Sequence, residues 1–466
     1  MARTTDQVNS PGARYSRHVL QAYGDLDGLK TEPPVMVTKA KGVYVYDDEG
    51  KEYIEGAAGM WCAALGFSDQ ELIEAACAQL RDMPWYHNLF DKGLPILGEL
   101  AEKLKAIAPA PMARVFFANS GSEANDAMAK LVWYYNNALD RPLKKKIIAR
   151  HHAFHGITGV AASMTGIPVM HQGFDLPLPG FLHTDLPHYY RDGRPGESEE
   201  AFASRLADNL EALILREGPE TVAAFIAEPV LGGGGCIVPP KTYFEKIQAV
   251  LKRHDVLMLA DEVITGFGRT GNMFGSETFA IRPDMMTLAK GLTSSYLPLS
   301  ALLVSEPIYA ALERQSRKFG LFAHAHTTTG HPASVAVALK VLEIFQKRDI
   351  LGHVRRIQPE FLGQIRGFAE HPLVGHTRGV GLMGAIELVA DKQTKRSFDP
   401  ALKIKNRVRV RAQELGAIVR TSTAGDSIAF SPPLIIDEGE LVELFRRFRR
   451  ALDDVHGEIR KEGLAA

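Results

Sequence analysis

Short apolar runs alternate with longer amphipathic stretches through the middle of this 466-residue chain. The apolar runs have the length of β-strands, and between them apolar residues recur at helical spacing. The predicted strands cover residues 114–118, 146–149, 222–227, 256–260, 284–289 and 300–304. Strands and helices in regular alternation predict an α/β fold with a largely parallel central sheet.

The two ends of the chain show a different pattern. Residues 43–46 and 52–55 are apolar and aromatic runs separated by turn residues, which predicts a β-hairpin. A long helix is expected over 333–346. The spacing of Asp437 and Glu440 is typical of a capping box, which predicts the start of a C-terminal helix.

The domain organisation follows from these patterns. We expect a large domain over residues 68–332, and a smaller α+β domain built from the N-terminal segment 1–67 and the C-terminal part 333–466. With 45% hydrophobic residues, a chain of this length can bury a large core.

Charge and cysteine content narrow the function classes. The chain carries 54 basic and 55 acidic residues, so it lacks the basic excess that binds nucleic acid or an anionic membrane. Its three cysteines, an odd number without C-x-x-C spacing, indicate reduced thiols. The N-terminus has no apolar signal core, and no run approaches the roughly 18 apolar residues of a membrane span. We expect a cytoplasmic protein whose partners are small molecules and a second copy of itself.

An amine and a carboxylate follow two of the predicted strands. Lys290 closes the run 286–289, and Asp261 closes the run 256–260. A lysine amine can form a Schiff base with an aldehyde cofactor, and a buried carboxylate can hold a pyridine nitrogen protonated. Each residue alone has a simpler interpretation, since most lysines are solvated and Asp commonly begins a turn.

A third feature lies upstream, where the strand 114–118 runs into Ser120, Gly121 and Ser122 and then into a helical pattern. Hydroxyl groups and free backbone N–H groups at a helix N-terminus favour a phosphate. The alternative is an ordinary helix cap, because serine at such a boundary needs no ligand. Together with Lys290 and Asp261, the pattern favours a phosphate-bearing aldehyde cofactor.

Other patterns point to weaker candidates. Gly266, Gly268 and Gly271 have the spacing of a dinucleotide fingerprint, but no helical pattern opens after them. The glycine run 232–235 lacks the ending of a phosphate-binding P-loop and is interpreted as a flexible turn. The histidine group 151–155 has no cysteine or carboxylate at metal-ligand spacing, so we predict no metal site there.

The chain resembles the class III aminotransferases, which are fold type I pyridoxal phosphate enzymes. The resemblance rests on the stretch 259–271, on Lys290 between Ala289 and Gly291, and on the stretch 119–123. It implies that pyridoxal 5'-phosphate forms a Schiff base on Lys290 and that Asp261 keeps the ring nitrogen charged. Two half-reactions at one site would then exchange an amino group by ping-pong kinetics.

The same resemblance assigns the remaining cofactor contacts. Phe154 and Val263 would press on the two faces of the ring, His155 follows the aromatic residue as in the family, and Glu228 would lie near the phenolic oxygen. Thr327 would reach the phosphate of a neighbouring subunit, which implies a homodimer or a dimer of dimers. Its alternative is a simple threonine-rich loop. The implied cofactor-binding set is Ser120, Gly121, Ser122, Phe154, His155, Glu228, Asp261, Val263, Lys290 and Thr327.

Phe154 replaces a tyrosine that is frequent in the omega-amine:pyruvate subgroup, so a hydroxyl contact is lost. His326 and Thr328 also depart from aromatic residues common in relatives. These changes predict a more open or more polar pocket wall.

Substrate recognition is expected from Trp61, Leu89, Phe90 and Arg420. Trp61 resembles an aromatic wall of the amine:pyruvate subgroup, with a core aromatic as its alternative. Arg420 resembles the arginine that clamps a keto-acid carboxylate, for which a planar guanidinium is suited; a surface salt bridge is its alternative.

The sequence thus predicts an omega-aminotransferase that moves an amino group from a primary amine or omega-amino acid to pyruvate. A 2-oxoglutarate-dependent enzyme of the ornithine or 4-aminobutyrate kind, a non-transaminating aminomutase or decarboxylase, and a binding protein without turnover are the alternatives.

Overall fold

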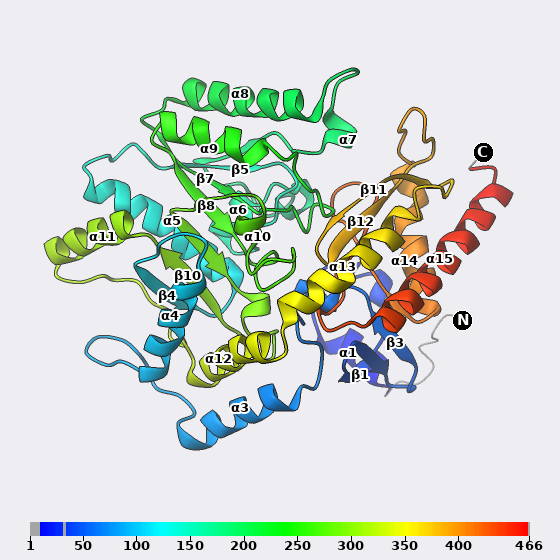
Figure 1. Ribbon diagram of the computed structural model, residues 1–466, viewed down its shortest axis with the longest axis horizontal. Helices are drawn as coiled ribbons and strands as arrows, with labels where there is room; N and C mark the ends of the chain where they lie inside the picture. The colour runs from blue at the N-terminus through cyan, green and yellow to red at the C-terminus, as the bar shows by residue number, and fades with distance from the viewer. Residues whose placement is uncertain (1–9, 31–33, 465–466) are drawn as a thin grey trace.

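A computed structural model describes residues 10–30 and 34–464, and the parts of the expected domains at 1–9, 31–33 and 465–466 lie outside the described residues. A seven-stranded sheet of order β4-β10-β9-β8-β7-β5-β6 forms the centre of the larger half of the molecule (Figure 1). Its strands are β4 (Arg114–Ala118), β5 (Lys146–Arg150), β6 (Phe181–Thr184), β7 (Val222–Ala227), β8 (Leu257–Asp261), β9 (Met285–Leu288) and β10 (Ser300–Val304).

Strand directions agree with the predicted sheet. Strands β5 to β9 pair in parallel, whereas β10 runs antiparallel to both β9 and β4. The α/β fold predicted from the sequence is confirmed. β6 was not predicted, because its four residues are two apolar residues followed by two polar ones and only its two ends are buried.

Helices cover both faces of this sheet because successive strand residues point to opposite sides. Ile226 packs on one face with α5 (Gly121–Ala138), α6 (Gly159–Met164) and α11 (Glu306–Phe319). Its neighbour Phe225 packs on the other face with α8 (Glu199–Glu217) and α9 (Tyr243–Arg253). Strand β7 is buried along its whole length, which explains its continuous apolar run.

Two four-stranded sheets form the smaller half (Figure 1). One joins β1 (Val37–Lys41), β2 (Tyr44–Asp47) and β3 (Glu52–Glu55) from the N-terminal region to β13 (Ala417–Ile418). The other contains β11 (Val374–Val380), β12 (Met383–Leu388), β15 (Ser427–Phe430) and β14 (Arg420–Thr421). Strand β13 pairs in parallel with β3, matching Ala417 to Ile54, so the two ends of the chain share one sheet.

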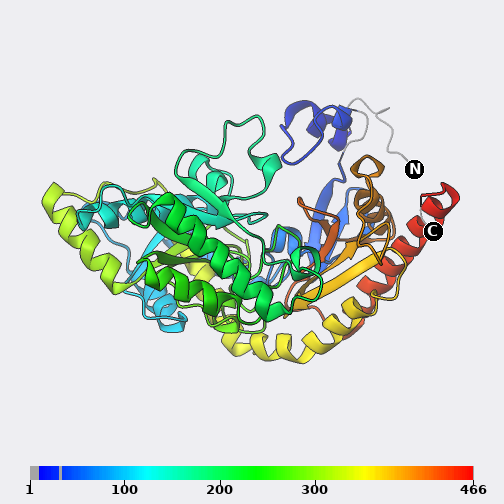
Figure 2. The same ribbon diagram turned by 90° about the horizontal axis from the view of Figure 1, so that it is seen from above.

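Helix α12 (Pro332–Lys347) connects the two halves, and α13 (Ile350–Arg366), α14 (Ile404–Glu414) and α15 (Glu438–Lys461) pack on the smaller half. The predicted capping box is present: Asp437 accepts a hydrogen bond from the backbone of Glu440, whose side chain accepts one from Asp437. In the view from above, α1 lies over the N-terminal side of the smaller half (Figure 2).

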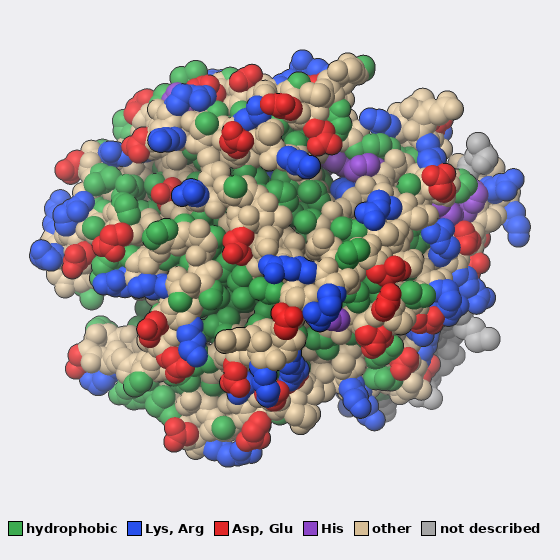
Figure 3. All heavy atoms as spheres, viewed as in Figure 1, with side chains coloured by type: hydrophobic (Ala, Val, Ile, Leu, Met, Phe, Trp, Pro, Cys, Tyr) green, Lys and Arg blue, Asp and Glu red, His purple; other side chains and the backbone are tan. Residues whose placement is uncertain are grey.

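The remaining helices are α1 (Pro11–His18), α2 (Ala58–Trp61), α3 (Gln70–Asp82), α4 (Pro95–Ile107), α7 (Tyr189–Asp192) and α10 (Gly275–Thr278), with 3-10 turns at Gly28–Lys30, Pro168–Met170, Lys290–Leu292 and Pro400–Leu402. Among the described helices, none combines the length and apolarity that a membrane crossing requires. Acidic and basic side chains are interspersed over the visible surface, without a large field of one sign (Figure 3).

Candidate active site

A cavity of about 370 Å³ opens where the carboxyl ends of the central strands meet. Asn119 follows β4, Glu228 follows β7, Asp261 ends β8 and Lys290 follows β9, so one edge of the sheet brings these side chains together. The cavity is lined by Asn119, Ser120, Gly121, Ser122, Asn125, Phe154, His155, Gly156, Glu228, Asp261, Val263, Ile264, Ala289, Lys290, Thr293, Ser295, Leu297, Pro298 and Leu299.

Lys290 begins a short 3-10 turn directly after β9 and has a left-handed φ of 44°. Loss of water lowers the pKa of its amine, although the nearby acidic groups Asp261 and Glu228 oppose that shift. A lysine with a lowered pKa has more of the neutral amine that acts as a nucleophile.

Asp261 is 3% exposed and is held by three donors. Its Oδ2 lies 2.8 Å from His155 Nδ1 and accepts a hydrogen bond of 2.9 Å from Asn125 Nδ2, while Oδ1 accepts one of 3.1 Å from the backbone of Val263. Burial alone raises the pKa of this carboxyl, but His155 and Asn125 outweigh burial and hold the pKa below its usual value. Asp261 therefore stays ionised although it is buried.

The turn into α5 is packed closely against the segment after β5. Ser120 caps α5, and Ser122 Oγ accepts a hydrogen bond of 3.2 Å from the backbone of Ile157. A Cβ on Gly156, whose φ is +131°, would come within 2.5 Å of Ser122 Oγ. Position 156 therefore requires glycine. The first residues of α5, an 18-residue helix, line the cavity, where a helix N-terminus offers unsatisfied backbone N–H groups.

Glu228 supports the ring-stacking candidate Phe154. Its Oε1 accepts a hydrogen bond of 3.0 Å from the backbone of Phe154, and Oε2 accepts one of 2.9 Å from Gly232. Burial raises the pKa of this carboxyl, partly opposed by His155. The glycine run that follows is packed closely against the segment after β5, since a Cβ on Gly234 would lie 2.5 Å from the carbonyl oxygen of His152.

Five predicted site residues do not line this cavity within one chain: Trp61, Leu89, Phe90, Thr327 and Arg420. Phe90 is 89% exposed with a φ of 60°, and Thr327 is also exposed. The neighbour of Thr327, Thr328, donates a hydrogen bond of 2.9 Å to Asn119 Oδ1, which keeps this loop beside the start of α5.

Trp61 and Arg420 are brought together by the small domain. Trp61 packs in a buried cluster with Ile264, a cavity-lining residue, so the core-aromatic interpretation and a place beside the cavity both hold. Arg420 is half-buried, and its guanidinium contacts the sulfur of Met60, the residue before Trp61. The exposed salt bridge considered for Arg420 does not form with any described residue.

Sequence reasoning gave no role to Asn125. Its side chain binds Asp261 and also donates a hydrogen bond of 2.7 Å to the backbone carbonyl of His155. Its place one turn after Ser122, on the buried side of α5, was a usable signal. The segment 293–299 was also missed, because its contribution depends on how the chain turns back into β10.

Glu262 and Arg269, in the most specific sequence stretch, are structural. Glu262 accepts hydrogen bonds from the backbone of Gly275 and Ser276, and buried Arg269 donates to the carbonyls of Leu382 and Pro432 in the smaller half.

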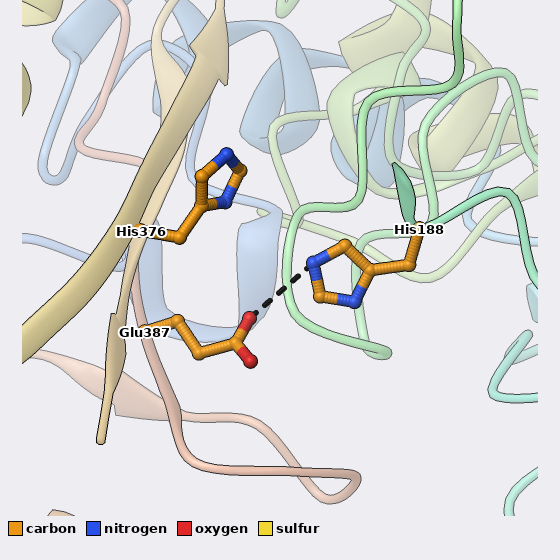
Figure 4. Close-up of side chains that lie close together, drawn as sticks. All are labelled: His188, His376 and Glu387. Carbon is orange, nitrogen blue, oxygen red and sulfur yellow. Dashed lines mark ion pairs between the residues drawn. The ribbon is translucent and has the colours of Figure 1, made fainter. Parts of the chain in front are cut away.

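A separate polar cluster lies between the two halves, where His188 faces His376 and Glu387 (Figure 4). These are possible metal ligands, but Glu387 already pairs with Arg378 at 2.7 Å and with Arg191. The guanidinium of Arg378 also lies 3.3 Å from His376 Nδ1. Two arginine cations thus surround the single carboxylate of this cluster, which leaves no excess negative charge for a metal ion.

Comparison with known proteins identifies relatives over nearly the whole chain. The family model "Aminotransferase class-III" matches residues 28–452. A probable gamma-aminobutyrate transaminase 2, mitochondrial, of Oryza sativa subsp. indica is 51% identical over 433 residues, covering 92% of this chain and 87% of that protein. Gamma aminobutyrate transaminase 1, mitochondrial, of Solanum lycopersicum is 49% identical over 420 residues, covering 90% and 81%.

Solved structures are equally similar. The omega transaminase from Pseudomonas jessenii in complex with PMP has a TM-score of 0.94 and 49% identity, covering 96% of this chain and 98% of that one. A thermostable omega transaminase variant engineered for asymmetric synthesis of enantiopure bulky amines has a TM-score of 0.95 and 48% identity, covering 97% and 100%.

Proposed function

Because this chain belongs to the class III aminotransferases, we propose that it transfers an amino group from a primary amine or omega-amino acid to pyruvate. The observation that carries this proposal is the placement of Trp61 and Arg420 beside the cavity. Trp61 lies in the turn after β3, Arg420 lies just after β13, and these two strands pair. An apolar wall suits the body of an amine, and a guanidinium next to it suits the carboxylate of a keto acid.

The cofactor of the family is pyridoxal 5'-phosphate, and the side chains of the cavity fit it. When bound, this group supplies an electron sink for reaction at the carbon that bears the amino group. Lys290 would hold its aldehyde carbon and move a proton there, Asp261 would pair with the ring nitrogen, and Ser120 to Ser122 would hold the phosphate. Phe154 and Val263 would contact the ring.

The relatives add information on the donor. The curated plant proteins are named for gamma-aminobutyrate, which is an omega-amino acid. One solved omega transaminase, engineered for bulky amines, carries replacements of a tryptophan, a phenylalanine and an arginine. These are the residue types of Trp61, Phe90 and Arg420, which supports their assignment to substrate recognition.

A homodimer with shared sites is part of this proposal. Phe90 and Thr327 are exposed and do not line the cavity of their own chain, as expected for residues that serve a second copy. In a mixed dimer of K290A and T327A chains, one site would combine Lys290 of one chain with Thr327 of the other. Mixing the two variants should therefore give more activity than either variant alone. The expected cytoplasmic location is proposed as well, and cell fractionation tests it.

The decisive experiment follows the visible absorbance of the bound cofactor after addition of 4-aminobutyrate or 1-phenylethylamine without acceptor. We expect the absorbance to fall and then to recover mainly with pyruvate. Recovery mainly with 2-oxoglutarate would favour the second candidate, an acceptor specificity of the ornithine or 4-aminobutyrate kind. No change with any amine would contradict transamination of these donors.

A further inference from the structure

The turn that carries Trp61 has an unusual backbone. Ala58, Gly59 and Trp61 have φ values of 45°, 65° and 66°, and Met60 between them is not helical. Left-handed φ values are costly for residues with a side chain, and they persist only where surrounding contacts impose them. Contacts with residues outside the turn must therefore hold the backbone between β3 and Trp61 in this conformation.

Glu55, the last residue of β3, supplies the missing contact. It is 5% exposed, and its Oε1 accepts a hydrogen bond of 2.9 Å from the backbone of Ala57. The backbone of Gly59 faces the same carboxyl group and, like Ala57, partly opposes the rise of its pKa that burial causes. One side chain thus faces the turn on both sides of Ala58.

Glu55 is also tied to the strand that leads to Arg420. It lies opposite Ile418 of β13, and the backbone of Gly56 donates a hydrogen bond of 2.9 Å to the carbonyl of Ile418. A Cβ on Gly56 would lie 2.8 Å from that carbonyl oxygen, so this close approach of the two strands requires glycine. The end of β3 at Glu55 and Gly56 therefore contacts both the turn 57–61 and β13, the strand that leads to Arg420.

The carboxyl group of Glu55 is buried without the ion pair that would stabilise its charge. No lysine or arginine in residues 10–30 or 34–464 forms an ion pair with it, and burial raises its pKa to about 7. A buried carboxyl without a cation is a cost to the folded state. Its cost is understandable if the position of the turn matters for function.

We propose that Glu55 is a positioning residue for donor recognition, because its carboxyl group fixes the strained turn 57–61 and so places the Trp61 indole beside the substrate cavity. This inference rests on the proposed function, since it assumes that Trp61 forms part of the donor pocket. Glu55 itself does not line the cavity.

The test compares E55Q with E52Q, a matched change on the exposed start of the same strand. A glutamine keeps the shape of Glu55 but replaces one acceptor oxygen with an N–H donor, so the side chain can no longer accept from the turn with both of its oxygen positions. We expect the ratio of kcat/KM for 2-aminopropane over 1-phenylethylamine, with pyruvate as acceptor, to change about tenfold in E55Q. E52Q should match the wild type.

Two further variants assign the effect to the turn. G59A adds a methyl group that meets only Cys62 Sγ, at 3.6 Å, but strains the backbone at a φ of 65°, so it should shift the donor ratio as E55Q does. In a W61A background, E55Q should no longer change the ratio, because the wall that it places is absent.

Hydrogen–deuterium exchange of the peptide 55–62 gives a readout independent of turnover. The amides of Ala57 and Gly59 should exchange faster in E55Q than in the wild type. In E52Q their exchange rates should equal those of the wild type. An unaltered donor ratio in a folded, cofactor-loaded E55Q, or an equal change in the W61A background, would overturn the proposal. If the wild type itself turns over neither amine, the proposed function fails instead; exchange at Ala57 and Gly59 still decides whether Glu55 holds the turn.

Discussion

The cofactor cavity and the edge that carries Trp61 and Arg420 differ in how their side chains are held. In the cavity, Asp261 and Glu228 each accept at least two hydrogen bonds from groups of the large domain. At the edge, the turn 57–61 has left-handed residues, and Arg420 contacts a thioether. The first region is built within the larger half of the molecule, whereas the second joins the two ends of the chain through the pairing of β3 with β13. The cofactor cavity and the proposed substrate edge are thus built from different parts of the fold.

Replacing Lys290 should cause the largest loss. K290A removes the group that moves a proton at the reacting carbon, and general acid–base transfer is worth about a hundredfold to ten-thousandfold in rate. Steady-state turnover measures the loss, and borohydride reduction followed by mass spectrometry should show no cofactor attached to the chain. K241A, at an exposed lysine, serves as the control. Full turnover in K290A would contradict the assignment of the cavity.

Arg420 should affect one half-reaction far more than the other. Loss of a charge-assisted hydrogen bond costs about 1.5–3 kcal/mol, so R420A should raise KM for pyruvate about ten- to hundredfold. The rate with a donor amine that has no carboxylate should stay within about twofold. R449A provides a matched arginine on α15, away from the cavity. Equal losses in both half-reactions would show that Arg420 supports the fold instead.

Asn125 tests how far the cavity depends on its hydrogen bonds. N125A removes the 2.9 Å hydrogen bond to Asp261 and so reduces the stabilisation of the ionised carboxylate. His155 still contacts this carboxylate at 2.8 Å. We expect the pKa of Asp261 to rise and kcat to fall about tenfold. A pH profile of kcat should show the acidic limb moved toward neutral pH. An unchanged profile would mean that His155 alone determines the state of Asp261.

The last prediction concerns stability at the substrate edge rather than turnover. Since burial raises the pKa of Glu55 from 4.5 to about 7, the folded state keeps a proton there that the unfolded state has lost. This contribution to stability is fully present below pH 4.5 and is lost as pH rises through 7. The wild type should lose about 3 kcal/mol of unfolding free energy across this range that E55Q does not lose. Denaturant unfolding at pH 5 and pH 8 measures the unfolding free energy of both proteins. An equal change in this free energy in the wild type and in E55Q would contradict the raised pKa.

Much of the cavity was predictable because strand ends in a parallel sheet converge. Lys290, Asp261 and Ser120 each follow an apolar run, so periodicity alone places them at one edge. The resemblance added Phe154, Val263 and Glu228, which also line the cavity.

The rest depends on three-dimensional contacts that spacing does not contain. The role of Asn125 follows from the rotation of α5 against β8, and the left-handed turn at Trp61 follows from a carboxyl group six residues earlier. Leu89, Phe90 and Thr327 do not join the cavity of their own chain, and their roles stay predictions. The strand β6 was lost because a short, half-buried strand has no distinctive pattern.

The pairing of β3 with β13 also has a consequence for the order of events during synthesis. The ribosome releases the N-terminal hairpin first, and β3 has an open edge until residues 417–418 emerge near the end of translation. All seven strands of the central sheet are complete by residue 304. A nascent chain therefore carries the elements of its cofactor cavity long before it can select a substrate, and its unpaired β3 edge is the place where such a chain is open to wrong pairing with another.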